Sequence, residues 1–172
     1  MRDLADEGRI RSLMRALGAS TREEAVVYLT GGATAVLEGW RAMTVDVDLK
    51  LAPESDALLR ALARLKDELG INVELASPAD FIPVREGWED RSPFVDRQGS
   101  VTFRHFELAA QALAKLERGH DRDLADVQAM LDRSLVDRAS LLSAFEQIES
   151  ELYRFPAINA AAFRRRVAES II

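Results

Sequence analysis

A segment typical of a β-strand runs directly into two adjacent glycines, and this junction limits how the chain can fold. The stretch AVVYLT, residues 25–30, is rich in β-branched and aromatic residues and predicts a buried strand. Gly31 and Gly32 end it, and the small apolar stretch ATAVLEGW that follows predicts a helix. The next segment, MTVDVDLKL at 43–51, alternates apolar and polar residues, which is typical of a second strand.

The remaining periodicities predict an α+β fold. Around this centre we expect helices at 10–18 and 55–70, strands at 71–76 and 100–106, a loop at 77–99, and helices at 107–118, 121–133, 137–153 and 158–170. Strands are confined to the first part of the chain. We therefore predict a small mixed sheet flanked by helices at residues 1–105, and a helical C-terminal region at 106–172 packed on that core.

Composition limits the classes of function. The chain of 172 residues is 48% hydrophobic, enough for a core of ordinary size, and its net charge of -6 is the wrong sign for holding nucleic acid by overall charge. It contains no cysteine and two histidines, which excludes disulfides, a thiol nucleophile and zinc sites rich in Cys or His. No apolar run reaches the ~20 residues of a membrane span, so we expect a cytoplasmic protein without membrane contact.

Asp46 and Asp48 are the first candidate ligands for a metal. Residues two apart on a strand project to the same side, so these carboxylates lie together while Val45, Val47 and Leu49 face the opposite way. Paired carboxylates suit Mg²⁺, which takes its other ligands from water and substrate phosphates. The alternative interpretation is an ordinary strand with one solvated face.

The two glycines favour the first interpretation. Glycines between a strand and a helix let a ligand approach the backbone and leave N–H groups that favour phosphate. The segment lacks both the dinucleotide-binding glycine pattern and the P-loop lysine. A phosphate-binding turn followed by a carboxylate pair indicates a site for a metal-bound triphosphate.

At these residues the chain resembles the DNA polymerase beta-like nucleotidyltransferase superfamily. The shared pattern is an apolar strand ending in Gly31-Gly32, a short helix, and then Val45-Asp46-Val47-Asp48-Leu49. The flanking pattern R-x-x-T-x-D-V-D-L, with Arg41 and Thr44, resembles the bacterial nucleotidyltransferase toxins of the AbiEii type and their small uncharacterised relatives. A second block, LAKLERGHDRDLADVQAML at 113–131, is similar to a downstream segment of those proteins.

The resemblance implies a metal-dependent nucleotidyltransferase that moves a nucleoside monophosphate from an NTP to a hydroxyl or phosphate acceptor, releasing pyrophosphate. It implies that Asp46 and Asp48 hold Mg²⁺ or Mn²⁺, and that the backbone N–H groups of Gly31 and Gly32 bind the phosphates. Thr34 is expected to add a hydroxyl to that phosphate contact.

A third carboxylate, which completes the metal site or accepts the proton in many members, is assigned to Glu74 between Val73 and Leu75. Asp80 is the alternative to Glu74, and a merely solvated Glu74 is the other possibility.

The helical region supplies further expected nucleotide contacts. The resemblance implies that Lys115 touches the triphosphate and that Asp123 or Asp126 orients it or the acceptor; the alternative is a surface ion pair between Lys115 and Asp123. We expect both aspartates to lie off the apolar face of their helix, which is assigned to Leu124, Val127 and Leu131.

Three further features have open interpretations. Arg41 binds phosphate or pairs with an acid such as Glu38. The basic cluster FRRRV at 163–167 is either a solvated helix face or a patch for RNA. His105 and His120 are expected at the surface or at helix ends.

The function that the sequence favours is therefore nucleotidyl transfer, toxin-like and acting on RNA or tRNA, with a cognate antitoxin as a possible partner. The alternative is a module on the same fold that binds nucleotide or a partner without turnover.

Overall fold

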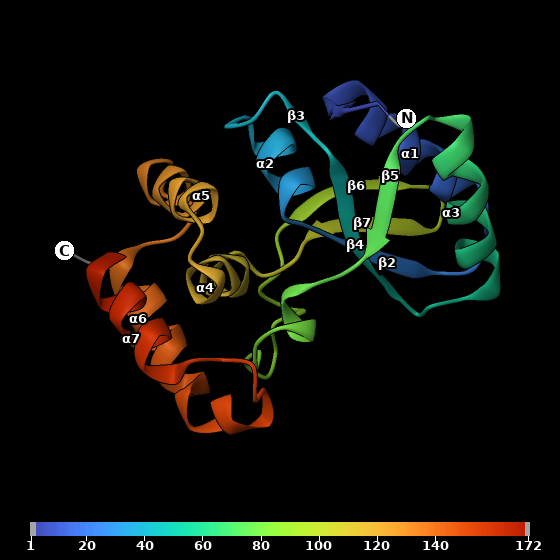
Figure 1. The fold of residues 1–172 in the computed structure, drawn as a ribbon. Helices are drawn as coiled ribbons and strands as arrows, with labels where there is room; N and C mark the ends of the chain where they lie inside the picture. Colours follow the sequence, from blue (N-terminus) through green and yellow to red (C-terminus); the bar gives the residue numbers. More distant parts are fainter. Residues whose placement is uncertain (1–2, 171–172) are drawn as a thin grey trace. The chain divides into compact units, whose positions relative to one another are not determined.

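The computed structural model describes residues 3–170, and they divide into two compact units (Figure 1). The first unit comprises residues up to Ser77 together with Ser92–His105. The second comprises Pro78–Arg91 and the residues from Phe106 onward. The first unit holds the sheet, and the second is helical, which confirms the expected α+β class with a helical C-terminal part.

The first unit is a five-stranded mixed sheet in the order β5-β4-β2-β7-β6. Its strands are β2 (Ala25–Thr30), β4 (Asp46–Ala52), β5 (Asn72–Leu75), β6 (Phe94–Gln98) and β7 (Val101–His105). Central β2 pairs antiparallel with β4 and parallel with β7. On one side β4 pairs parallel with β5, and on the other side β7 pairs antiparallel with β6. Two short strands, β1 (Ala5–Asp6) and β3 (Met43–Thr44), form a separate antiparallel pair.

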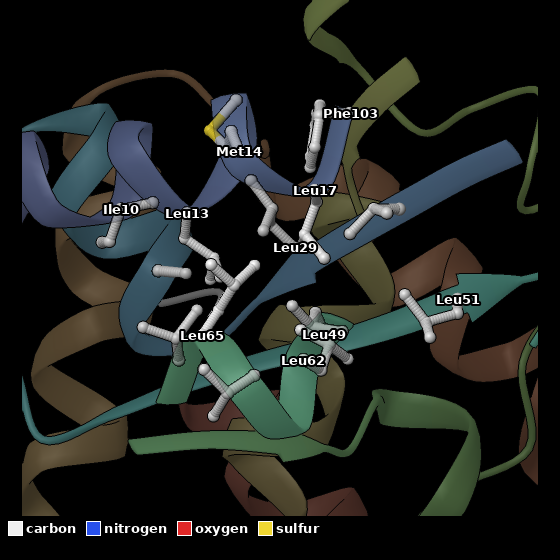
Figure 2. Packing of buried hydrophobic residues seen from close by; sticks show 14 of the residues in the cluster. Ile10, Leu13, Met14, Leu17, Leu29, Leu49, Leu51, Leu62, Leu65 and Phe103 are labelled. Carbon is white, nitrogen blue, oxygen red and sulfur yellow. The ribbon is translucent and has the colours of Figure 1, made fainter. Parts of the chain in front are cut away.

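Helices cover one face of this sheet. The helices of the first unit are α1 (Glu7–Ala19), α2 (Gly32–Glu38) and α3 (Asp56–Glu68). Figure 2 shows α1 residues Ile10, Leu13, Met14 and Leu17 meeting Leu62 and Leu65 of α3 and the strand residues Leu29, Leu49, Leu51 and Phe103. Burial alternates along β4, where Val47, Leu49 and Leu51 are buried and the residues between them are half-buried. The aspartates therefore lie on the face opposite this core.

Local sequence signals explain most of these boundaries. The side chain of Asp6 caps α1 by accepting a hydrogen bond from the Arg9 N–H, and Ser55 caps α3 in the same way from Leu58. Gly18 does not end the first helix as expected. It lies inside α1, where a Cβ would come within 2.8 Å of the backbone carbonyl carbon of Gln98, so glycine is needed for close packing on β6.

Two strand predictions need correction. The expected strand at 43–51 is split, because Met43–Thr44 pair with β1 and β4 begins only at Asp46; Val45 is 55% exposed and is not in the core. The expected loop at 77–99 contains the short 3-10 helix η1 (Pro78–Asp80) and strand β6. β6 lacks clear alternation because it is an edge strand with an irregular register at Phe94/Asp96.

The second unit is built around α4 (Leu108–Arg118). Packed with it are α5 (Asp121–Asp132), α6 (Arg138–Ile148) and α7 (Ala160–Ser170). The 3-10 helix η2 (Glu149–Arg154) follows α6 and contacts it. Phe145 of α6 meets Phe163 of α7 edge to face, with ring centroids 4.9 Å apart.

The segment Pro78–Arg91 belongs to this helical unit through specific contacts. The buried carboxylate of Glu107, the N-cap residue of α4, accepts hydrogen bonds from both Arg85 and Arg91. Trp88 stacks on Phe106 with ring centroids 4.1 Å apart. The two arginines neutralise a carboxylate that would be costly to bury alone.

Candidate functional site

The turn between β2 and α2 has a backbone that requires glycine. Gly31 has φ 58° and ψ -125°, a combination that residues with a Cβ adopt only under strain. It is the N-cap residue of α2, which starts at Gly32, and its carbonyl accepts the N–H of Ala35. The double glycine thus ends the strand and starts the helix within one residue.

This turn lies directly against the aspartate strand. The Cα register pairs Thr30 with Asp48, and a Cβ on Gly31 would lie 3.1 Å from Oδ2 of Asp48. The glycine backbone and the carboxylate, seventeen positions apart in sequence, are therefore neighbours in the first unit. Only a residue without a side chain keeps open the space between them.

Gly32 makes an equally close contact with the residue before the strand. A Cβ on Gly32 would come within 2.6 Å of Cβ of Thr44 and still closer to its hydroxyl. The Thr44 hydroxyl donates a hydrogen bond of 2.9 Å to the backbone carbonyl of Asp46. Thr44, which is buried, thereby fixes the start of β4 beside the glycine turn.

Asp46, Asp48 and Glu74 share one face with a fourth polar residue that the sequence did not single out. Register pairs Asp46 with Asn72 and Asp48 with Glu74 on β4 and β5. The Asn72 amide donates to the Asp46 carboxylate and, at 3.4 Å, to that of Glu74. Its position two residues before Glu74 on the same strand was the signal that could have revealed it.

The donor set of this face fits a hard divalent cation held by two carboxylates. Within residues 3–170, no group of three or more His, Asp or Glu side chains is arranged to hold a metal ion. Asp46 and Asp48 are both half-buried carboxylates, and Mg²⁺ is commonly bound through one or two such groups with water and substrate phosphates completing the shell. Glu74 is exposed beside Asp48 and is not part of a three-carboxylate cluster.

Thr34 points into the protein. Its side chain is fully buried, and its hydroxyl lies 2.9 Å from Nδ1 of His105 and 3.3 Å from the carbonyl oxygen of Leu29. Nε2 of the same imidazole lies 2.9 Å from Oε1 of Glu38. Thr34 and Glu38, one turn apart on α2, therefore fasten that helix to the end of β7. This geometry gives the Thr34 hydroxyl internal partners and offers no support for a direct phosphate contact.

The prediction that His105 lies at the surface is wrong. The residue is 2% exposed and in register with Leu29, on the apolar face of the sheet. Burial lowers the pKa of His105, and the neighbouring Glu38 carboxylate, which raises it, does not compensate. A neutral imidazole is thus favoured, with Nε2–H donating to the Glu38 carboxylate. His120, by contrast, is exposed at the N-cap of α5, as expected.

In the second unit, Lys115 belongs to a buried ion cluster. Its ammonium lies 2.7 Å from Oδ2 of Asp126 and 3.9 Å from Oδ1 of Asp123, and Arg118 also donates to Asp123 at 2.7 Å. Lys115 and both aspartates have less than a tenth of their side chains exposed. The ion-pair interpretation therefore describes the contacts, but the pair is buried and its principal acid is Asp126.

The expected orientation of α5 needs the same correction. Asp123 and Asp126 face inward with Val127, while Leu124 is 39% exposed. The aspartates lie on the inner face of α5 because pairing with the buried Lys115 lowers the cost of burying a carboxylate. Whether Lys115, Asp123 and Asp126 also contact a nucleotide stays a prediction.

The other candidate residues are placed as follows. Arg41 is half-buried between α2 and β3, and Asp80 is exposed at the end of η1 in the second unit. The side chain of Glu38, proposed as the partner of Arg41, is bound to His105.

The cluster FRRRV is occupied by internal contacts. Arg164 pairs with Glu149, Arg165 lies 3.8 Å from Glu169, and Arg166 donates to the carbonyls of Leu116 and Glu117. These contacts favour the interpretation of a structural helix face over a free basic patch.

A mixed sheet with a glycine turn packed against an Asp-x-Asp strand defines the class of protein as nucleotidyltransferase-like. A family model described as "Nucleotidyltransferase of unknown function (DUF6036)" matches residues 8–164, and the chain belongs to that family. Comparisons with curated proteins and with solved structures gave no significant match. Within residues 3–170, none of the helices combines the length and the apolar character needed to cross a membrane.

Proposed function

We propose that this chain is a metal-dependent nucleotidyltransferase that moves a nucleoside monophosphate from an NTP to a hydroxyl or phosphate acceptor. The observation that carries the proposal is that a Cβ on Gly31 would lie 3.1 Å from Oδ2 of Asp48, because this places the glycine turn beside the carboxylate pair. Membership of a nucleotidyltransferase family supports the same reaction class.

In this proposal Asp46 and Asp48 hold Mg²⁺ or Mn²⁺. The bound cation supplies charge neutralisation at the triphosphate and a template for its orientation. Asn72 donates to the Asp46 carboxylate, which restricts the rotation of that side chain. Gly31 and Gly32 let the phosphates approach the backbone, and Thr44 holds the carboxylate strand at the turn.

Glu74 is assigned as the general base that removes the proton of the attacking acceptor. Register places it beside Asp48, and its side chain is exposed on the same face, where an acceptor hydroxyl can reach it. A carboxylate in this position removes the proton as the new oxygen–phosphorus bond forms, and pyrophosphate leaves. Asp80 is not preferred, because it lies outside the sheet unit.

The similarity of the two sequence blocks to AbiEii-type toxins supports RNA or tRNA as the acceptor and a cognate antitoxin as a partner. The same similarity supports nucleotide contacts by four further residues, which are Arg41, Lys115, Asp123 and Asp126.

The test is incubation with each α-labelled NTP, Mg²⁺ and total cellular RNA, followed by gel electrophoresis and measurement of pyrophosphate. We expect label in RNA together with pyrophosphate release, and neither product with the Asp46→Asn/Asp48→Asn double variant. Wild-type protein that binds NTP but releases no pyrophosphate would instead support the non-catalytic binding module.

A further inference from the structure

Four side chains form a row across the face of the sheet opposite the core, and the proposed chemistry uses none of them. The Cα register places Lys50 of β4 beside Tyr28 of β2, Tyr28 beside Arg104 of β7, and Arg104 beside Phe94 of β6. Registered neighbours on adjacent strands project to the same side of a sheet. The row therefore alternates a cation with an aromatic ring over four strands of one unit.

This row adjoins the carboxylates. Lys50 follows Asp48 by two residues on β4, so both side chains project to the face opposite the core, with their Cα atoms about 6.6 Å apart. The preceding row, set by register, is Glu74, Asp48 and Thr30. A molecule that reacts at the carboxylates and extends along the strand direction therefore meets Lys50 first.

Neither cation has an acidic partner among the described residues. Both are half-buried, and no salt bridge joins Lys50 or Arg104 to a carboxylate in the described part of the chain, residues 3–170. Arg104 donates one hydrogen bond, of 2.9 Å, to the carbonyl oxygen of Ser92, which leaves most of its five N–H donors for other groups. The arginines of FRRRV differ, because Arg164 and Arg165 lie beside carboxylates and Arg166 donates to two backbone carbonyls.

Phe94 at the end of the row has an exposed aromatic ring. It is 61% exposed, whereas Tyr28 is 5% exposed and presents little of its ring. Exposed aromatic rings beside cations bind single-stranded nucleic acid through base stacking combined with phosphate contacts. Because the whole chain carries a net charge of -6, a local row of this kind is what a phosphate-bearing ligand requires.

We propose that Lys50 and Arg104 form an anion-binding row for the phosphate groups of the acceptor, distinct from the site of the NTP triphosphate, with Phe94 as a stacking surface at its end. The identification of the ligand as the acceptor rests on the proposed function, but binding to the row requires neither NTP nor metal. The phosphates belong to an oligonucleotide chain or to a free mononucleotide.

The experiment measures binding without Mg²⁺ or NTP. The probes are a fluorescent single-stranded RNA 12-mer of mixed sequence and, separately, a labelled nucleoside 5′-monophosphate, each over a range of salt concentrations. The proteins are wild type, Lys50→Met, Arg104→Met, Arg104→Lys and Phe94→Ala. Lys66→Met on α3 is the matched control, because Lys66 is also half-buried and lies on another element.

For Lys50→Met and Arg104→Met we expect about tenfold weaker binding of whichever probe the wild type binds. The slope of log affinity against log salt falls by about 0.7 for each cation removed, a change that a purely structural role does not produce. Arg104→Lys recovers the salt slope. Phe94→Ala weakens binding of the 12-mer without changing that slope, and Lys66→Met matches the wild type.

Three results would overturn the row: wild type that binds neither probe, unchanged affinity in both Met variants, or weaker binding with an unchanged salt slope. Thermal unfolding of each variant guards against misfolding, and Arg104→Lys keeps the test decisive if Arg104→Met does not fold. Failure of the proposed function gives a different result: no label is transferred from NTP, while the 12-mer is still bound.

Discussion

The hydroxyl of Thr44 occupies the space where a side chain on Gly32 would lie, and it donates to the carbonyl oxygen of Asp46 at 2.9 Å. One threonine therefore links the glycine turn to the first carboxylate of the strand. This contact explains why a small residue follows Gly31 and why Asp46 begins its strand at a fixed distance from the turn.

Gly32→Ala should destabilise the first unit. The added methyl group overlaps Thr44, and overpacking of this kind costs about 1–3 kcal/mol in the free energy of unfolding. Urea unfolding measures the effect. Gly8→Ala in α1 is the control, because the nearest atom to its Cβ lies at an ordinary 3.4 Å.

The Gly32 substitution should cost less when Thr44 is already alanine, because the closest atom has been removed. Equal costs in both backgrounds would show that the contact with Thr44 is not what requires glycine.

Asp46→Asn/Asp48→Asn should abolish binding of a divalent ion while leaving the fold intact. The carboxylates repel each other on one face, and their neutralisation removes that repulsion, so the melting temperature without metal should rise or stay constant. Calorimetric titration with Mg²⁺ and each NTP measures the loss. Glu146→Gln on the exposed face of α6 controls for lost charge. Unchanged Mg²⁺–NTP affinity in the double variant would remove the metal assignment.

His105 should make stability depend on pH. Because burial lowers its pKa in the folded state, the unfolded chain binds a proton first as the pH falls through the ordinary histidine value of about 6.5. The stability that wild type has over His105→Gln is therefore full above that pH and declines below it. Urea unfolding of both proteins from pH 8 to pH 5 tests this.

His120→Gln, at an exposed helix end, should leave the pH profile of stability unchanged. A wild-type advantage over His105→Gln that grows on acidification would mean that His105 is charged in the folded protein.

Lys115→Met should be strongly destabilising. It leaves the buried Asp126 carboxylate without its 2.7 Å partner, and breaking a buried pair in this way costs about 3–5 kcal/mol. Combination with Asp126→Asn should recover part of the loss. Arg64→Met, which breaks an exposed pair with Glu68, should change stability by about 1 kcal/mol at most.

Mg²⁺–NTP affinity measured on the same Lys115 variant addresses its implied contact with the triphosphate. We expect affinity to fall about tenfold to hundredfold if the ammonium also binds phosphate. Unchanged affinity in a folded variant would limit Lys115 to its structural pair.

Local patterns in the chain predict most elements of secondary structure and the position of the Asp-x-Asp strand. The strand Ala25–Thr30, the turn at Gly31-Gly32 and the serine cap of α3 are encoded by residues close together in the chain, so local propensity and periodicity suffice to predict them. The same holds for the face on which Asp46 and Asp48 lie, since it follows from alternation along a single strand.

Which residues of different elements become neighbours follows from the folded arrangement alone. Asn72 beside Asp46, His105 between Thr34 and Glu38, and Lys50 in one row with Arg104 depend on strand order and register, which no local pattern specifies. Edge strand β6 was missed because its irregular register with β7 obscures the alternation of its residues. The inward aspartates of α5 were missed because their burial depends on the packing of α5 against the preceding helix, where pairing with Lys115 lowers the cost of burying a carboxylate.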